Sequence, residues 1–182
     1  MNLKKIKQIL LIIMTTYFMN GCSPNNDDAI AYFEAKYFAI EKLVDLDNEF
    51  QKVLEKNVTK NPNDIEISEE EYLQNIQLIT NKQDNLKAYV DKLIADESLK
   101  QSPQQNLDRA YQVLINAYGK AINEEYDKLI HILKQENPDE EMDKQFNAIY
   151  QAASVNLNNQ LDIFYTASEE YAKENKIEIN WK

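Results

Sequence analysis

The chain has 182 residues and a formal net charge of −11, from 20 basic and 31 acidic residues. This length is enough for one folded domain with its own hydrophobic core. A chain this acidic repels nucleic acids over long range, so the sequence predicts no nucleic-acid partner.

The N-terminal residues have the layout of a secretory signal. Lysines at positions 4, 5 and 7 precede an apolar run over residues 9–19, and Gly21 stands directly before Cys22, the single cysteine of the chain. A positive start, a short apolar run and a small residue are typical of a signal peptide. The run is shorter than the roughly 20 apolar residues that span a bilayer as a helix. We therefore interpret residues 1–21 as a signal peptide.

The segment Met19-Asn20-Gly21-Cys22 resembles the lipobox of bacterial lipoproteins. Gly21 matches the lipobox, Met19 replaces the usual leucine, and Asn20 departs from the usual small residue. The resemblance implies that Cys22 is acylated, for example with palmitate, and becomes the new N-terminus. Acyl chains anchor a protein because each buried CH₂ adds about 0.8 kcal/mol. A plain signal peptide with an incidental cysteine, or an uncleaved anchor, is the alternative.

Four long segments with helical periodicity follow. Hydrophobic residues recur every three or four positions, and helix breakers are rare, with two glycines and four prolines in the chain. Helix-start signals occur at Ser68 with Glu71, at Ser102-Pro103 and at Asn137-Pro138. The expected helices cover residues 27–57, 68–95, 102–135 and 137–175. The sequence therefore predicts an all-α fold, an antiparallel up-down four-helix bundle of long helices preceded by a signal-peptide helix.

The same features divide the chain into four parts. We expect a signal peptide over residues 1–21, a lipidated tether over 22–26, the bundle over 27–175 and a C-terminal tail over 176–182. In the tail, apolar residues alternate with polar ones, which predicts a short extended segment.

Gly119 lies in the middle of the third expected helix, where glycine costs roughly 1 kcal/mol relative to alanine. Folding the third and fourth helices back about the turn at residues 136–137 places Gly119 opposite Ala153 and Ser154. All three residues are small. We therefore predict a close approach of two backbones at this level.

Polar residues interrupt the apolar stripes of the helices. These are Asp47, Gln83 and Glu125 in the first three helices and Asn156 or Gln160 in the fourth. We expect each to lie at the edge of its stripe and to reach water, because an unpaired buried carboxylate is costly. The alternative is a polar pocket between the helices that binds a small ligand. Tyrosines have the same two interpretations, and we expect most of them at the edge of the core.

Acidic residues gather at the two helix starts that face away from the tether in such a bundle. They are Glu69, Glu70, Glu71, Asp139, Glu140 and Glu141, with Asp64, Glu66 and Glu136 nearby. Negative charge matches the helix dipole there. We predict an acidic cap remote from the membrane, with a surface for a cation or a basic partner as its functional alternative.

Signals of catalysis are missing from the sequence. Bundles that hold two metal ions use Glu and Glu-x-x-His ligands, whereas this chain has no Glu-x-x-His and a single histidine, His131. It has no Cys-x-x-Cys-His segment and too few glycines for a phosphate-binding loop. We predict no catalytic residue, no metal site and no cofactor, and a protein that is not an enzyme.

Several segments of the mature chain look like a small surface-lipoprotein family from spirochaetes and other diderm bacteria, named only by a locus. The resemblance rests on residues 107–111, Tyr118, residues 125–130, Leu161-Asp162 and residues 170–174. It would cover nearly the whole mature chain. The family has no assigned activity, so the resemblance implies no functional residues.

The sequence leads to the hypothesis of an exported, lipid-anchored module with an interaction or structural role at the cell envelope. Its acyl chains on Cys22 would hold it in a membrane. A protein partner would be compatible with this role, and the sequence identifies none. Ser23 stands where an aspartate retains lipoproteins at the inner membrane, which favours the outer membrane. The alternative is a binder of a small ligand or cation, through the polar positions between helices or through the acidic cap.

Overall fold

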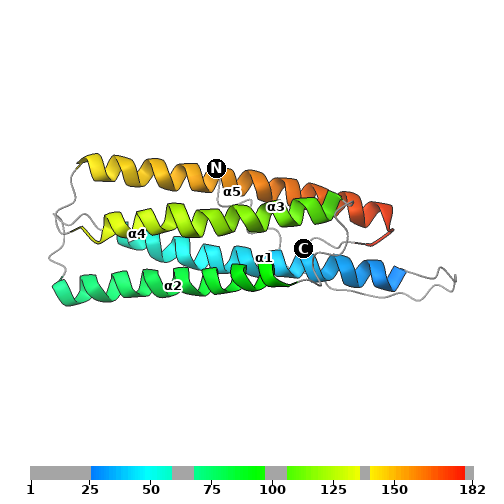
Figure 1. Cartoon of the computed structure of the whole chain (residues 1–182), viewed down its shortest axis with the longest axis horizontal. Coiled ribbons are helices and arrows are strands. Elements are labelled where there is room, and N and C mark those ends of the chain that lie inside the picture. Colours follow the sequence, from blue (N-terminus) through cyan, green and yellow to red (C-terminus); the bar gives the residue numbers. More distant parts are fainter. Residues whose placement is uncertain (1–25, 59–67, 97–105, 136–139, 179–182) are drawn as a thin grey trace.

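The structure, a computed structural model, describes residues 26–58, 68–96, 106–135 and 140–178. They form four long helical rods that lie side by side (Figure 1). Three rods are single helices: α1 (Asn26–Val58), α2 (Glu69–Ala95) and α5 (Glu140–Glu174). The other rod joins α3 (Asn106–Lys120), a π-helical segment (Ala121–Tyr126) and α4 (Asp127–Leu133). The predicted all-α four-helix bundle is confirmed.

Contacts between the rods establish the up-down order. Tyr32, near the start of α1, packs against Tyr171 near the end of α5, with ring centroids 5.3 Å apart. Glu55, near the end of α1, accepts a 2.8 Å hydrogen bond from the Tyr150 hydroxyl, near the start of α5. Neighbouring rods are therefore antiparallel, and α3 runs parallel to α1, with which it forms a diagonal pair.

The predicted start of α2 is confirmed by its cap. The Ser68 hydroxyl accepts a 3.2 Å hydrogen bond from the Glu71 backbone N–H, which satisfies a donor that the first helical turn leaves unpaired. The expected caps at Ser102 and Asn137 lie outside the described residues, as do the signal peptide, most of the tether and the last four residues of the tail.

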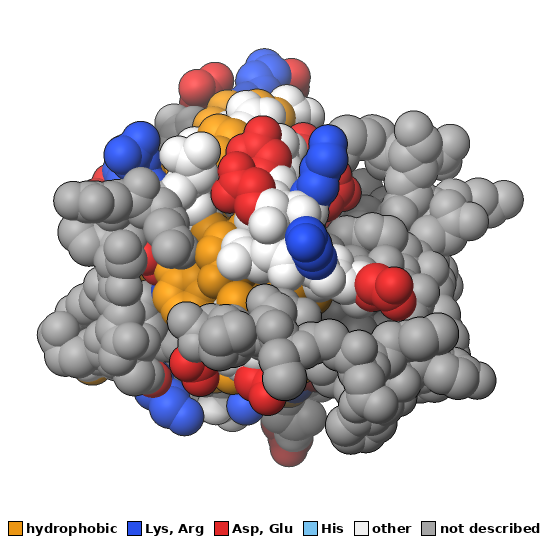
Figure 2. Space-filling view, turned by 90° about the vertical axis from the view of Figure 1, so that its right-hand side faces the viewer, with side chains coloured by type: hydrophobic (Ala, Val, Ile, Leu, Met, Phe, Trp, Pro, Cys, Tyr) orange, Lys and Arg blue, Asp and Glu red, His pale blue; other side chains and the backbone are white. Residues whose placement is uncertain are grey.

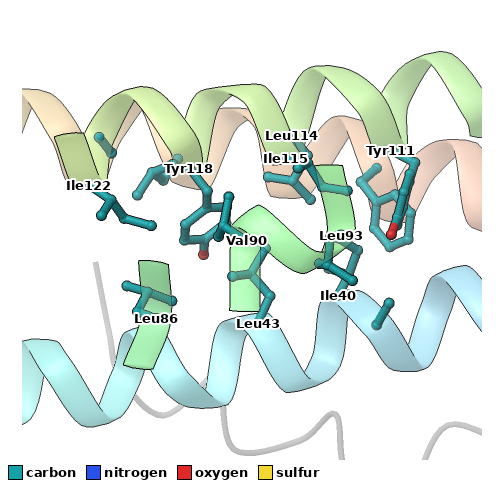
Figure 3. Close-up of a cluster of buried hydrophobic side chains, with 14 of the residues drawn as sticks. Ile40, Leu43, Leu86, Val90, Leu93, Tyr111, Leu114, Ile115, Tyr118 and Ile122 are labelled. Carbon is teal, nitrogen blue, oxygen red and sulfur yellow. The ribbon is translucent and has the colours of Figure 1, made fainter. Parts of the chain in front are cut away.

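The core lies where the apolar stripes of the rods meet (Figure 3). Leu43 of α1, Leu86 and Val90 of α2 and Leu114 of α3 are fully shielded from water. Burying one such side chain stabilises the fold by about 1.5–3 kcal/mol. The same figure shows Tyr111 and Tyr118 pointing from α3 toward α1. Most of the described tyrosines lie at the core edge, as expected. Four are instead buried inside the core, which corrects the expectation for Tyr37, Tyr111, Tyr118 and Tyr126.

The third rod departs from the uninterrupted α-helix that the sequence predicted. Core positions Leu114, Tyr118, Ile122 and Tyr126 follow one another at intervals of four residues. In a helix of 3.6 residues per turn, each such interval turns the stripe by about 40°, so it would leave the core. A π-helical turn contains more residues per turn and absorbs this drift. As a result Tyr126, and not Glu125, occupies the core position.

The C-terminal end of α5 turns back on itself. Lys176 adopts φ 55°, and the Ile177 backbone N–H donates a 2.8 Å hydrogen bond to the Ala172 carbonyl. This left-handed residue with a six-to-one hydrogen bond is a Schellman motif. It brings Ile177 against the core. The tail therefore begins with a helix cap, and its remaining apolar residues, Ile179 and Trp181, lie outside the described residues.

The structure corrects the predicted surroundings of Gly119. A Cβ atom at Gly119 would lie 3.7 Å from Ile94 Cδ1 and 3.8 Å from Val90 Cγ1, both on α2. Gly119 thus faces α2, and not Ala153 or Ser154 on α5. These distances are ordinary van der Waals contacts with side chains, so there is no close approach of two backbones here.

Gly119→Ala is therefore expected to stabilise the protein. The methyl group fits without displacement, and replacing a mid-helix glycine by alanine gains about 1 kcal/mol. For a chain of this size that corresponds to a rise of about 2–4 °C in Tm, measurable by circular dichroism. The matched control Ala148→Gly, at an exposed position of α5, should lower Tm by a similar amount. An unchanged or lower Tm for Gly119→Ala contradicts this packing.

Candidate functional site

Asp47 lies in the interior between α1 and the third rod, with only 5% of its surface exposed. Its carboxylate accepts hydrogen bonds from the hydroxyls of Tyr126 at 2.8 Å and Tyr118 at 3.4 Å. One turn further along α1, the Gln51 side-chain amide donates a 2.7 Å hydrogen bond to it. The expectation that Asp47 reaches water at the edge of its stripe is wrong.

Burial is the main cause of the perturbed acidity of Asp47. Desolvation of the charged form raises its pKa from 3.8 to about 6, and the hydrogen bonds from Tyr126, Gln51 and Tyr118 oppose the rise only in part. The same burial, together with the nearby Asp47, raises the pKa of Tyr118 and of Tyr126 well above the usual range. These phenols therefore stay protonated and remain hydrogen-bond donors to Asp47.

Gln83 is also buried, with 7% of its surface exposed, which again contradicts the stripe-edge expectation. Its amide donates to the Ile122 carbonyl at 3.1 Å, inside the π-helical segment, and to the Asp127 carboxylate at 2.5 Å, directly after it. Gln83 of α2 thus binds the segment at the point where its helical geometry changes. π-Helical turns occur frequently at functional sites. Here the group that donates a hydrogen bond to the π-helical segment is the side-chain amide of Gln83, a residue of the same chain.

Glu125 is half-buried, and its Oε2 atom is shielded from water. Asn156 is exposed and Gln160 is half-buried. Among the described residues, no hydrogen bond or ion pair joins Asp47, Gln83 and Glu125 to one another. The two fully buried members are each bonded to groups of the protein. The described residues therefore show no bonded network that joins these three side chains.

A buried ion pair lies nearer to the start of α1. Lys36 Nζ is 2.9 Å from Asp108 Oδ1, and both side chains are almost completely shielded from water. The ammonium group also lies over the rings of Tyr32 and Tyr111, 4.8 and 4.7 Å from their centroids, an arrangement that favours a cation. Sequence reasoning missed this pair because Lys36 was not distinguishable from a surface lysine.

The acidic residues at the starts of α2 and α5 lie at one end of the bundle (Figure 1). Glu70, Glu71, Glu140 and Glu141 are exposed, and Lys144 forms a 2.9 Å ion pair with Glu140. The side chain of Glu69 and all of Asp139 lie outside the described residues, as do Asp64, Glu66 and Glu136. No group of three or more His, Cys, Asp or Glu side chains is arranged to hold a metal ion in the part of the chain that the structure describes.

The opposite end of the bundle, where α1 begins and α5 ends, faces the viewer in Figure 2. On the described surface at this end, acidic and basic side chains lie next to each other, and hydrophobic side chains are exposed beside them. His131, the single histidine, is exposed on α4 near the other end, and its ring contacts the Gln135 amide at 3.2 Å.

A cleft of about 510 Å³ runs between α3 and α5 on the outside of the bundle. Its floor contains the small residues Ala110 and Ala167, and Val113 and Ile163 lie along it with 43% and 52% of their surfaces exposed. The other residues that line it are polar: Asn106, Arg109, Gln160, Asp162, Thr166 and Glu170. Sequence reasoning missed this cleft, although Arg109, the single arginine of the chain, was a signal for it.

No protein-family model, no curated protein and no solved structure matches this chain significantly. None of the described helices combines the length and the apolar composition that crossing a membrane requires.

Asp47 is expected to make the stability of the protein depend on pH. Its pKa is higher in the folded protein than in the unfolded chain, so between about pH 4 and pH 6 the folded state binds a proton that the unfolded state has lost. The contribution of Asp47 to the free energy of unfolding is therefore present below about pH 4. It is lost as the pH rises through about 6. At about 1.36 kcal/mol per pKa unit, the loss is about 3 kcal/mol.

Urea denaturation of the wild type and of Asp47→Asn at pH 4 and pH 7 measures this effect. The stability of the variant relative to the wild type should rise by about 2 kcal/mol between the two pH values, because part of the full loss already occurs below pH 4. The exposed control Asp84→Asn should show no such rise. Glu41, whose pKa is also raised by burial, is common to all three proteins and cancels. A constant difference between Asp47→Asn and wild type would contradict the assignment.

Gln83→Met should destabilise the protein at neutral pH. The substitution keeps the volume of the side chain but removes the donor to the Ile122 carbonyl and to Asp127, which costs about 1–3 kcal/mol. The matched control is Gln77→Met, also on α2, where the exposed amide bonds only the Asn81 side chain. The free energy of unfolding of the two variants should differ by at least about 1 kcal/mol. Equal values argue against a role for Gln83 in holding the π-helical segment.

Proposed function

We propose that this chain is a lipid-anchored protein of the bacterial cell envelope and that its bundle is a non-catalytic interaction or structural module. Acylation of Cys22 fixes one end of the molecule to a membrane, and the bundle presents its helical surfaces next to that membrane. The outer membrane is the proposed location, because Ser23 stands where an inner-membrane retention signal has aspartate.

The observation that carries this proposal is the short distance along the chain between Cys22 and the bundle. α1 begins at Asn26, four residues after the cysteine, and four residues reach at most about 14 Å. A lipidated Cys22 would therefore hold the start of α1 and the end of α5 close to the lipid headgroups. A helix of 33 residues, such as α1, extends about 50 Å, so the starts of α2 and α5 are free to reach well away from the surface.

The interior of the bundle supports a module that works through its surface. Asp47, Gln83 and the Lys36–Asp108 pair direct their polar atoms at partners within the protein. A small ligand would have to break these bonds before it could bind there. The alternative, a binder of a small ligand or cation, would instead use the exposed carboxylates at the starts of α2 and α5.

Cys22→Ala is expected to release the protein from the membrane. The full-length wild type, produced in a diderm bacterium, should partition into the detergent phase and carry acyl chains on an N-terminal Cys22 by mass spectrometry. Cys22→Ala should lose both properties, and the neighbouring control Ser23→Ala should keep them.

Crosslinking and affinity capture from native envelopes, with the Cys22→Ala form alongside, then tests the interaction role. A wild-type N-terminus that is free of fatty acid contradicts the anchor. A bound metal or prosthetic group at unit stoichiometry contradicts the non-catalytic role.

A further inference from the structure

The face formed by α3 and α5 is poor in charge. Residues 110–119 contain no charged residue, and residues 145–168 contain one, Asp162, in a chain of which 28% is charged. The exposed side chains of these stretches are mainly amides, alanines and aliphatic residues, including Val113, Val155 and Ile163. Depletion of charge around exposed apolar residues distinguishes the centre of a protein interface from ordinary surface.

Charges return at the edges of the cleft, and they are of opposite sign on its two sides. Arg109 lies on the α3 side, and Asp162 and Glu170 lie on the α5 side. All three are exposed, and in the described part of the structure none of their three side chains forms an ion pair or a hydrogen bond. Arginine is enriched at interfaces because its planar guanidinium pairs with carboxylates through two hydrogen bonds.

We propose that this face binds a second copy of the same chain, related by a two-fold axis that runs parallel to the helices along the cleft. Such an axis places α3 of one copy opposite α5 of the other. Arg109 of each copy then meets Asp162 and Glu170 of the other copy, and Val113 meets Ile163. The Tyr111–Phe164 ring contact, with centroids 6.3 Å apart, sets the register of α3 and α5 that brings these positions to the same level.

The direction of the axis follows from charge and from the proposed anchor. A two-fold axis across the helices would place α3 against α3 and Arg109 on the same side as its copy, which leaves the carboxylates of α5 without a cation. An axis along the helices instead places Arg109 of each copy next to the α5 carboxylates of the other copy. It also keeps the starts of both α1 helices on one side, so that two acylated copies can share one membrane. This last argument rests on the proposed function.

The available area suits a reversible dimer. From Val155 to Glu170 the face is about 23 Å long and two helices wide, which gives about 1,000 Å² for both copies together, the size at which specific interfaces begin. Attachment of both copies to one membrane raises their effective concentration. A moderate interface is then sufficient.

Disulfide crosslinking of the full-length chain in its membrane tests the geometry. Val113→Cys and Ile163→Cys copies with different tags are produced together and oxidised, and they should form a covalent heterodimer. A matched pair with the exposed Phe38→Cys of α1 in place of Val113→Cys should give at least tenfold less product. The wild-type chain, oxidised in the same way, gives the background yield of dimers linked through Cys22. Equal yields for the two pairs overturn the proposal.

Charge exchange tests the recognition. In sedimentation equilibrium of the detergent-solubilised full chain, Arg109→Glu should weaken self-association at least tenfold, and the triple exchange Arg109→Glu, Asp162→Lys, Glu170→Lys should restore it. Circular dichroism confirms that these exposed substitutions leave the helices intact. A monomeric wild type overturns the proposal, as does an Arg109→Glu variant that dimerises like wild type or a different protein bound at this face instead.

The anchor and the dimer fail separately in these experiments. Partition of the same samples into detergent reports the acylation of Cys22, whatever the crosslinking shows. A dimer without acylation contradicts only the proposed anchor, and acylation without a dimer contradicts only the proposed interface.

Discussion

Two polar contacts join α1 to the third rod, which lies diagonally across the bundle and contains α3 and the π-helical segment. These contacts set the register of the bundle. Lys36 pairs with Asp108 near one end, and Asp47 accepts hydrogen bonds from Tyr118 and Tyr126 further along. Apolar stripes alone permit helices to slide past each other. A slip of one helical turn, about 5.4 Å, would break both contacts and leave charge unpaired in the core. Only one alignment of the rods satisfies both.

The π-helical segment follows from this register. Tyr118 and Tyr126 are eight residues apart and would point about 80° away from each other in a regular α-helix, yet both hydroxyls reach Asp47. The wider turn between them brings both tyrosines to the same side. Gln83 supplies a donor to a carbonyl within that turn. The irregular segment is thus bound from α1 and from α2, and the opposite side of the rod is left to pack with α5.

This arrangement separates the interior of the molecule from the surface that is proposed to act. Asp47, Gln83 and the Lys36–Asp108 pair bond to groups inside the bundle. Arg109, Asp162 and Glu170 instead line an external cleft. A protein of this kind would work by holding a defined surface beside a membrane. The uncharged stretches of α3 and α5 are the part of that surface that differs most from the rest of the acidic chain.

Periodicity, caps and the scarcity of glycine and proline were sufficient to predict four long helices and their antiparallel order, because these features act within one helix or between neighbours in sequence. The environment of Asp47, Gln83 and Gly119 could not be predicted in this way. The apolar stripe of a helix predicts which residues face the core with an uncertainty of about one position along the chain. An error of one position is enough to place Glu125 in the core instead of Tyr126. Which rod faces a given stripe, and which buried polar group finds a partner there, depends on the packing of all four rods. Local sequence therefore determined the elements of this protein, and only the tertiary structure decided its internal polar contacts and the cleft between α3 and α5.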